Sequence, residues 1–232
     1  MPKDFNLRNM VVDLEYSIMG TDAHVAIYKA CPPKEGLSVL EAGCGSGKFG
    51  LAYALKGCGE VVMIDVDEEV LNYARRLRDA VNDLRGCRRE GVAALPTSYL
   101  NRSVFKMPED WTNRFDFVFA EGTAQHWIEE DLRQGCIDEM VRVSKGIVLI
   151  MGNNGLREEE QHADQFFSFT YKGMPPKRRC FTPDELRVRL SKAGLRNLSI
   201  GGVTPGLIED SYLIVGWGTK SDVNSNVDDN KL

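Results

Sequence analysis

The stretch Val39-Leu40-Glu41-Ala42-Gly43-Cys44-Gly45-Ser46-Gly47-Lys48 places an apolar run directly before a glycine-rich turn. A second apolar run, Val61-Val62-Met63-Ile64, ends at Asp65. Glycine takes positive φ readily and carries no Cβ, so the backbone here can turn sharply and approach a ligand closely. Between the two runs, residues 48–56 are predicted to form a helix whose first amides have no intrahelical partner. The segment therefore predicts a strand, a turn, a helix and a second strand that ends in a carboxylate.

The position of Asp65 indicates a ligand that contains a ribose, because a carboxylate at the end of a parallel strand can accept both ribose hydroxyls. Two glycine patterns overlap before it. Gly43, Gly45 and Gly47 give G-x-G-x-G, whereas Gly45, Gly47 and Gly50 give the G-x-G-x-x-G of a dinucleotide site. Asp65 follows at about the 20 residues that the dinucleotide pattern requires. The glycines alone therefore do not distinguish the two kinds of ligand.

Three other residues narrow the choice. A Walker loop needs a glycine where Ala42 stands and a serine or threonine where Phe49 stands, so nucleoside triphosphate hydrolysis is disfavoured. Glu41, at the end of the first strand, would repel a pyrophosphate but can accept a hydrogen bond from an ammonium group. S-adenosylmethionine has this ammonium and a ribose, and it has no phosphate. The sequence therefore favours S-adenosylmethionine over NAD.

Four stretches of the chain resemble, in order, the motifs of the class I S-adenosylmethionine-dependent methyltransferases of small-molecule type. Val39 to Gly47 is similar to the first motif, and Val62 to Asp67 to the second. Arg114 to Trp127 resembles the fourth strand and its loop, and Asp138 to Ile150 the following helix and fifth strand. The resemblance covers roughly residues 37–217. It implies an α/β fold, namely a Rossmann-like doubly wound sheet with a C-terminal antiparallel strand pair.

The resemblance also implies which residues bind S-adenosylmethionine. The expected cofactor-binding residues are Glu41, Ala42, Gly43, Cys44, Gly45, Asp65, Val66, Ser103, Val104, Glu121 and Gly122. Tyr16 is added because it can reach the methionine carboxylate if the first predicted helix folds over the site. The chain departs from the family pattern at two positions. Ser103 stands where the third strand usually supplies an aspartate beside the adenine, and Gln125 replaces the glutamate often found before His126. A hydroxyl still accepts one hydrogen bond, so Ser103 remains a candidate contact.

Composition indicates a soluble enzyme with one domain. The chain has 232 residues, 43% of them hydrophobic, and contains neither an apolar run long enough to span a membrane nor a secretory signal. We expect a cytoplasmic protein with a single domain at residues 1–220 and a disordered polar tail at 221–232. The net charge of −5 gives no general attraction to nucleic acid. The short basic cluster at residues 177–179 is expected to be a solvated loop.

The six cysteines show no spacing that suits zinc, and we predict no metal site: Cys31, Cys44, Cys58, Cys87, Cys136 and Cys180. Cys44 lies within the glycine loop, where a packing and cofactor-contact role explains it more simply than nucleophilic catalysis.

Local patterns predict several further elements. A helix at residues 10–30 ends at two prolines, and a helix at 68–84 carries an apolar stripe of Val70, Ala74, Leu77, Val81 and Leu84. Another helix begins at residues 182–185, where Thr182 and Glu185 form a capping box, and Gly194 ends it. The apolar runs at 195–203 and 212–217 have no helix between them, which favours an antiparallel pair.

The acceptor side of the predicted site is less defined. The long connection at 153–179 and the helix at 10–30 are expected to cover an apolar or aromatic small-molecule acceptor, although aromatic residues in the connection could equally seal the core. Methyl transfer depends mainly on in-line positioning, with a base for oxygen or nitrogen acceptors. His126 is the first candidate base and His162 the second. Methylation of a protein or peptide, and cofactor binding without catalysis, remain alternatives; the acceptor atom and the oligomeric state stay open.

Overall fold

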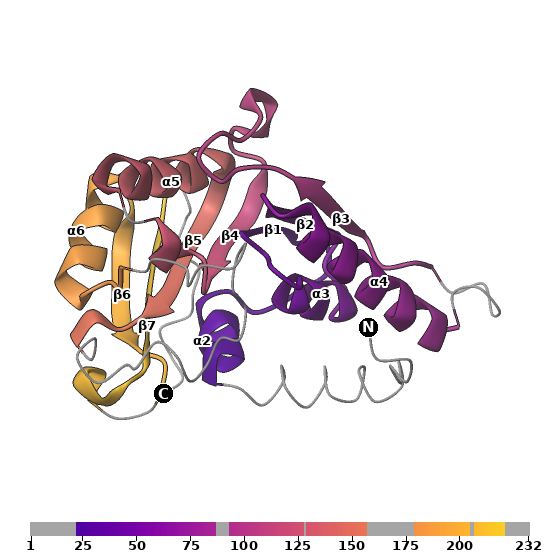
Figure 1. Ribbon diagram of the computed structural model, residues 1–232, viewed down its shortest axis with the longest axis horizontal. Coiled ribbons are helices and arrows are strands. Elements are labelled where there is room, and N and C mark those ends of the chain that lie inside the picture. Colours follow the sequence, from indigo (N-terminus) through magenta and orange to yellow (C-terminus); the bar gives the residue numbers. More distant parts are fainter. Residues whose placement is uncertain (1–21, 87–92, 128, 157–178, 205–206, 221–232) are drawn as a thin grey trace.

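The computed structural model describes residues 22–86, 93–127, 129–156, 179–204 and 207–220, which form a seven-stranded sheet (Figure 1). The strand order is β3-β2-β1-β4-β5-β7-β6. Strands β1 to β5 run parallel, and β7 is antiparallel to both of its neighbours. The strands are β1 (Ser38–Ala42), β2 (Glu60–Asp65), β3 (Thr97–Asn101), β4 (Phe115–Glu121), β5 (Ser144–Asn153), β6 (Arg196–Gly202) and β7 (Leu213–Thr219). The predicted α/β fold with a C-terminal antiparallel pair is confirmed.

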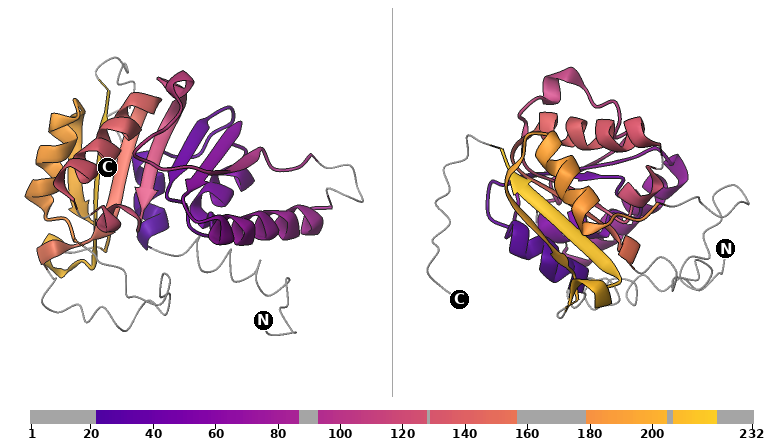
Figure 2. Two further views of the ribbon diagram at one scale, coloured as in Figure 1. Left: turned by 45° about the horizontal axis from the view of Figure 1, so that its top comes forward. Right: turned by 90° about the vertical axis from the view of Figure 1, so that its left-hand side faces the viewer.

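Helices cover both faces of this sheet (Figure 2). One core cluster joins one face to α2 (Asp22–Ala30), α3 (Lys48–Leu55) and α4 (Glu68–Leu84). The other cluster joins the opposite face to α5 (Glu130–Val143) and α6 (Pro183–Lys192). Short 3-10 helices are η1 (Glu109–Trp111), η2 (Ala124–His126) and η4 (Ile208–Asp210). The strands between the two clusters are therefore buried on both sides, which is typical of a parallel sheet.

Helix α4 has the predicted bounds, but its buried stripe differs from the prediction. The buried residues include Leu71, Ala74, Leu77 and Val81, whereas Leu84 is 52% exposed and Val70 is only half-buried. Leu71 takes the place of Val70 because both phases keep helical spacing and the side of α4 that packs against the sheet contains Leu71. Asp67 caps the start of the helix, because its side chain accepts a hydrogen bond from the Glu69 N–H.

The start and end of α6 follow the prediction in part. Thr182 Oγ1 accepts a hydrogen bond from the Glu185 N–H at 3.2 Å, and Pro183 is the first helical residue. Gly194 has φ 87° just beyond the helix, a conformation that favours glycine. The second half of the capping box was wrong, because the Glu185 carboxylate binds arginine side chains instead of the Thr182 N–H.

The chain leaves β5 and returns to the same place before α6. Asn154 forms a parallel bridge with Phe181. The Gly155 N–H donates to the Phe181 carbonyl at 2.7 Å, and the Phe181 N–H donates to the Asn153 carbonyl at 3.2 Å. Backbone hydrogen bonds therefore join the two ends of the connection at 153–179.

Several predictions lie outside the described residues. Of the predicted helix at 10–30, only α2 is described, and the tail at 221–232 and most of the connection at 153–179 are not. Within the described ranges, no helix is both long enough and apolar enough to cross a membrane.

Candidate functional site

The carboxyl ends of β1 and β4 form the crevice at which the site lies. The two strands are neighbours, yet β1 leads into α3 on one face of the sheet and β4 leads toward α5 on the other. In open α/β sheets, ligands bind where the connections diverge in this way. Two loops therefore border the crevice, at residues 43–47 and 122–127.

The glycine loop requires its glycines for two different reasons. Gly43, Gly45 and Gly47 have φ of 69°, 53° and 68°, in the left-handed region that side chains rarely adopt. A Cβ on Gly43 would lie 2.4 Å from Thr123 Oγ1, so the two loops touch at this point. A Cβ on Gly45 would meet no described atom within 4 Å, so this glycine faces open space. The loop thus packs closely against Thr123 at Gly43 and leaves room for a ligand next to Gly45.

Asp65 is held directly against this loop. Its Oδ2 accepts a hydrogen bond from the Gly45 N–H at 2.9 Å, and its Oδ1 accepts one from the Asp67 N–H at 2.9 Å. Each carboxylate oxygen has a second lone pair for a further donor. Asp65 therefore lies directly against the glycine loop, and hydrogen bonds fix both of its oxygens in place.

Glu41 lies beneath the loop and is 2% exposed. Its Oε2 accepts a hydrogen bond from the Gly50 N–H at 2.8 Å. Burial, with further contributions from the charges of Glu121 and Asp65, raises the pKa of Glu41 to about 8. A Cβ on Gly50 would lie 2.7 Å from this oxygen, so Gly50 is needed for its contact with a carboxylate. The third glycine of the dinucleotide pattern thus has a packing explanation that involves no phosphate.

Glu121, at the end of β4, is the second carboxylate of the crevice. Burial raises its pKa, and the positive charge of Lys48 opposes the shift. The positive charge of Lys48 also lowers the pKa of Glu41, so the Lys48 ammonium lies close enough to act on both carboxylates. Gly122 follows with φ 65° and faces open space among the described residues.

The residues after β2 and β3 form the other end of the site. Val66 is 63% exposed, and its carbonyl accepts a hydrogen bond from Asn101 Nδ2 at 3.0 Å. The third strand ends at Asn101, so Ser103 lies in the following turn and not at the strand end. Ser103 Oγ accepts a hydrogen bond from the Phe105 N–H at 3.2 Å, and the Val104 side chain is buried. The Ser103 hydroxyl therefore already forms a hydrogen bond within a local turn, a role that the resemblance to the family motifs did not indicate.

His126 is exposed on η2, and its backbone N–H donates to the Thr123 carbonyl at 2.9 Å. Gln125 is buried, and its Oε1 accepts a hydrogen bond from the Asn153 N–H at 3.1 Å. The residue that replaces the usual glutamate therefore ties the loop to β5. Tyr16 and His162 lie outside the described residues.

Ala42 and Cys44 are buried at the start of the loop. The Cys44 N–H donates to the Ile64 carbonyl at 2.9 Å, and burial strongly raises the pKa of its thiol. A thiol with a raised pKa is a poor nucleophile, which agrees with the predicted packing role. The described cysteines are free thiols, and the described residues contain no group of three or more His, Cys, Asp and Glu side chains able to hold a metal ion.

Sequence reasoning missed two residues next to the site. Thr123 contacts Gly43, and only the proximity in space of two loops that are distant in the sequence reveals this contact. Arg133 is completely buried on α5, although arginine in an amphipathic pattern is normally assigned to the exposed face. Arg179, predicted to be solvated, instead forms ion pairs with Glu130 and Glu185.

Comparisons with known proteins agree with this geometry. Residues 39–146 match the model of a methyltransferase domain. Magnesium protoporphyrin IX methyltransferase from Synechocystis PCC 6803 with bound SAM is 14% identical, with 95% of this chain and 86% of that chain covered and a TM-score of 0.59. A SAM-dependent methyltransferase from Aquifex aeolicus is 22% identical, with 93% and 99% covered and a TM-score of 0.58.

A third similar structure is a complex of the Haloferax volcanii Trm112 methyltransferase activator with its putative methyltransferase. It is 16% identical, with 91% of this chain and 93% of that chain covered and a TM-score of 0.62. The curated proteins gave no match to the sequence.

Proposed function

We propose that the chain is a class I S-adenosylmethionine-dependent methyltransferase, which transfers a methyl group from this cofactor to a small-molecule acceptor. The observation that carries the proposal is the position of Asp65 against the Gly45 N–H, at the edge where β1 and β4 diverge. A ribose hydroxyl can reach the second lone pair of each Asp65 oxygen there.

The remaining contacts fit the other parts of the cofactor. Glu41 is buried and Glu121 is half-buried beside the loop, and a cationic ammonium would relieve the cost of removing these carboxylates from water. Val66 offers an exposed apolar surface for the adenine ring. Ser103 and Val104 follow β3, whose last residue, Asn101, donates to the Val66 carbonyl. The open space above Gly45 and Gly122 allows a ligand to approach the backbone closely.

The chemical step needs little from the protein. Bound S-adenosylmethionine supplies a methyl group already activated by its sulfonium. The chain must hold the acceptor in line with the carbon–sulfur bond, and such positioning alone contributes large rate enhancements. We assign His126 as the base that removes a proton from an oxygen or nitrogen acceptor, because it is exposed in the loop after β4.

A small acceptor is supported by three observations. The similar Synechocystis enzyme is named for a small molecule, magnesium protoporphyrin IX. The net charge of −5 does not favour a nucleic acid. The two ends of the connection at 153–179 meet at the same edge of the sheet as the site, which is where a connection that covers an acceptor would begin and end.

Calorimetric titration tests the cofactor assignment. We expect S-adenosylmethionine and S-adenosylhomocysteine to bind, NAD not to bind, and Asp65→Ala to lose both adenosyl ligands. Binding of NAD alone would refute the proposal.

Methyl transfer is then measured with cofactor labelled at the methyl group against a panel of small molecules and a protein extract. Label in a small product supports the proposal, and label only in precipitated protein supports the peptide alternative. A protein that binds the cofactor but never forms S-adenosylhomocysteine with any acceptor would be a non-catalytic module. His126→Ala should lower turnover and leave the cofactor affinity unchanged.

A further inference from the structure

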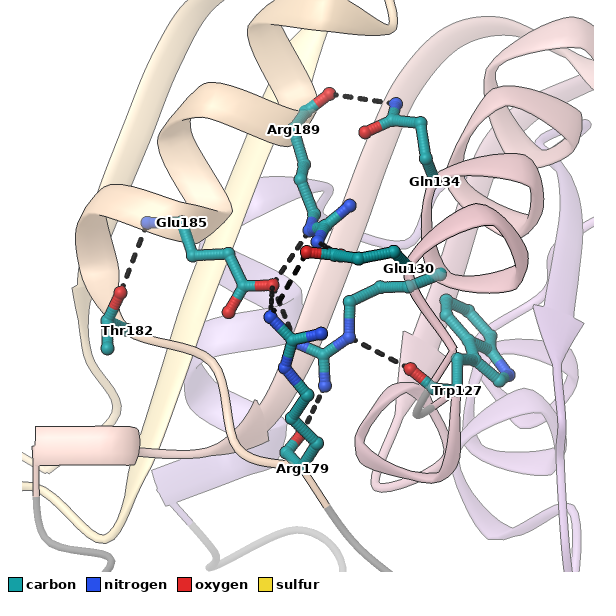
Figure 3. A network of polar contacts seen from close by, with 8 residues as sticks. Trp127, Glu130, Gln134, Arg179, Thr182, Glu185 and Arg189 are labelled. Atoms are coloured by element: carbon teal, nitrogen blue, oxygen red, sulfur yellow. Dashed lines mark hydrogen bonds and ion pairs between the residues drawn. The ribbon is translucent and has the colours of Figure 1, made fainter.

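A cluster of charged side chains, buried at Arg133 and exposed at Glu130, joins α5, α6 and the segment that precedes α6. It consists of Glu130, Arg133, Arg179, Glu185 and Arg189. Figure 3 shows Glu130, Arg179, Glu185 and Arg189 pointing toward one another from these elements. The cluster lies outside the predicted cofactor contacts, and the proposed mechanism does not use it.

Arg133 is the central residue of the cluster and is 0% exposed. Its Nε donates to the Trp127 carbonyl at 2.9 Å, its Nη1 donates to Glu185 Oε1 at 3.0 Å, and its Nη2 donates to the Arg179 carbonyl. Its guanidinium carbon lies 3.8 Å from the centre of the Phe181 ring. One planar cation thus contacts the loop after β4, the segment before α6, and α6 itself.

Stability alone does not explain a buried arginine at this position. Removing a guanidinium from water costs several kcal/mol, and apolar residues of similar volume often stabilise a protein equally well or better. Burial lowers the pKa of Arg133, although Glu185 opposes the shift. The planar guanidinium can, however, donate to several acceptors in a fixed geometry, which an apolar residue cannot do. The contact set therefore favours a role in fixing geometry.

The geometry that Arg133 fixes is that of the loop at residues 122–127. Its Trp127 acceptor directly follows His126, the proposed base. The Arg179 N–H donates to the Gln125 carbonyl at 2.8 Å, so the segment that Arg133 holds also holds this loop. The other end of the loop, at Thr123, packs against Gly43.

We propose that Arg133 is a positioning residue for methyl transfer, which holds the 122–127 loop against the glycine loop and the end of β5. This inference rests on the proposed function, since it is this loop that carries His126 and Thr123. Loss of the three guanidinium hydrogen bonds should make the 122–127 loop more mobile and displace His126. Misplacement of a catalytic group by about 1 Å can lower a rate by about 100-fold.

The test compares Arg133→Met with Arg133→Lys and with Arg114→Met. The Arg114 guanidinium donates to Glu60 Oε1 at 2.6 Å and lies 5.2 Å from the Trp111 ring, just before β4 and at the opposite edge of the sheet from the site. Arg114→Met therefore removes an arginine that, like Arg133, pairs with a glutamate and lies over an aromatic ring, without touching the 122–127 loop; its side chain is 36% exposed. Arg133→Lys keeps the positive charge but loses the planar guanidinium that donates to three acceptors at once.

Hydrogen–deuterium exchange of the 122–127 amides is measured in each variant, with and without S-adenosylhomocysteine. We expect about tenfold faster exchange and about tenfold weaker S-adenosylhomocysteine binding in both Arg133 variants and neither change in Arg114→Met. If Arg133→Met lowers the melting temperature but leaves both the exchange and the affinity unchanged, Arg133 is only structural and the inference is wrong.

Two further readouts keep the test decisive. If Arg133→Met does not fold, Glu185→Gln removes the charged partner of Arg133, and the same exchange comparison applies. If the wild-type protein does not bind S-adenosylhomocysteine, the proposed function fails. The exchange of the 122–127 amides in the free proteins then still decides whether Arg133 holds this loop.

Discussion

Replacing Glu41 by glutamine should stabilise the free protein at neutral and alkaline pH. Burial raises the pKa of Glu41 to about 8 in the folded chain, against an ordinary value of 4.5. The folded state therefore binds this proton more tightly than the unfolded state, and its stability falls as pH rises from 4.5 to about 8. This difference in pKa corresponds to at most about 5 kcal/mol, since each pKa unit is about 1.4 kcal/mol. Glutamine is neutral and can still accept the Gly50 N–H.

Urea unfolding of the two proteins between pH 4.5 and pH 9 measures this effect. The free energy of unfolding of Glu41→Gln, relative to that of the wild type, should rise by up to about 1.4 kcal/mol per pH unit and then level off above about pH 8. Parallel pH profiles for the two proteins would refute the reasoning, because they would mean that Glu41 does not titrate differently on folding.

The same residue should couple cofactor binding to pH. An ammonium placed near Glu41 favours the charged carboxylate, so S-adenosylmethionine should bind more tightly as pH rises from 6 to 8 and should release a proton on binding. Calorimetry in two buffers of different ionisation enthalpy detects that proton. Glu41→Gln should bind the cofactor more weakly and release no proton, so stability and cofactor affinity change in opposite directions.

Three further substitutions test the site and its scaffold. Asp65→Asn should weaken S-adenosylhomocysteine binding by about 10- to 100-fold in a titration, whereas Asp67→Asn, which keeps the cap of α4, should leave the affinity unchanged. Gly43→Ala should abolish binding, because its Cβ would overlap Thr123 and its φ would be strained; adding Thr123→Gly should restore part of the affinity. Thr182→Ala should lower the free energy of unfolding by about 1 kcal/mol in urea, and Thr182→Ser should not. Equal affinities of Asp65→Asn and Asp67→Asn would contradict the first explanation. The second would be wrong if Thr123→Gly restored no affinity to Gly43→Ala, and the third if Thr182→Ala and Thr182→Ser were equally stable.

Local signals in the sequence were sufficient for most of the fold. The first strand and its glycine turn, the bounds of α4 and the antiparallel β6–β7 pair follow from periodicity, turn residues and the absence of an intervening helix. The error in the stripe of α4 arose because a helical pattern has several nearly equivalent phases. Only the packing against the sheet selects Leu71 over Val70.

The site was predictable where a single stretch of chain builds it. Asp65 and Gly45 are 20 residues apart, and their hydrogen bond follows from one strand–turn–helix–strand unit. The contacts of Gly43 with Thr123, and of Arg133 with Trp127, Arg179 and Glu185, join elements that are separate in the sequence. Patterns within one sequence do not indicate which distant residues contact one another. The Glu185 carboxylate therefore seemed available for a capping box that the arginine cluster prevents.

The paired ends of the connection between β5 and α6 have a consequence for how this protein could change its acceptor. Since backbone hydrogen bonds join Asn153 and Gly155 to Phe181, we expect that the sequence between Leu156 and Arg179 can be exchanged without moving the strands or the glycine loop. Arg179 itself must stay, because it contacts Gln125 and Arg133. The entropy of closing a loop changes by only about 0.6 kcal/mol when its length doubles. This junction is thus a suitable site at which connections from other proteins could be inserted while the strands and the glycine loop stay in place.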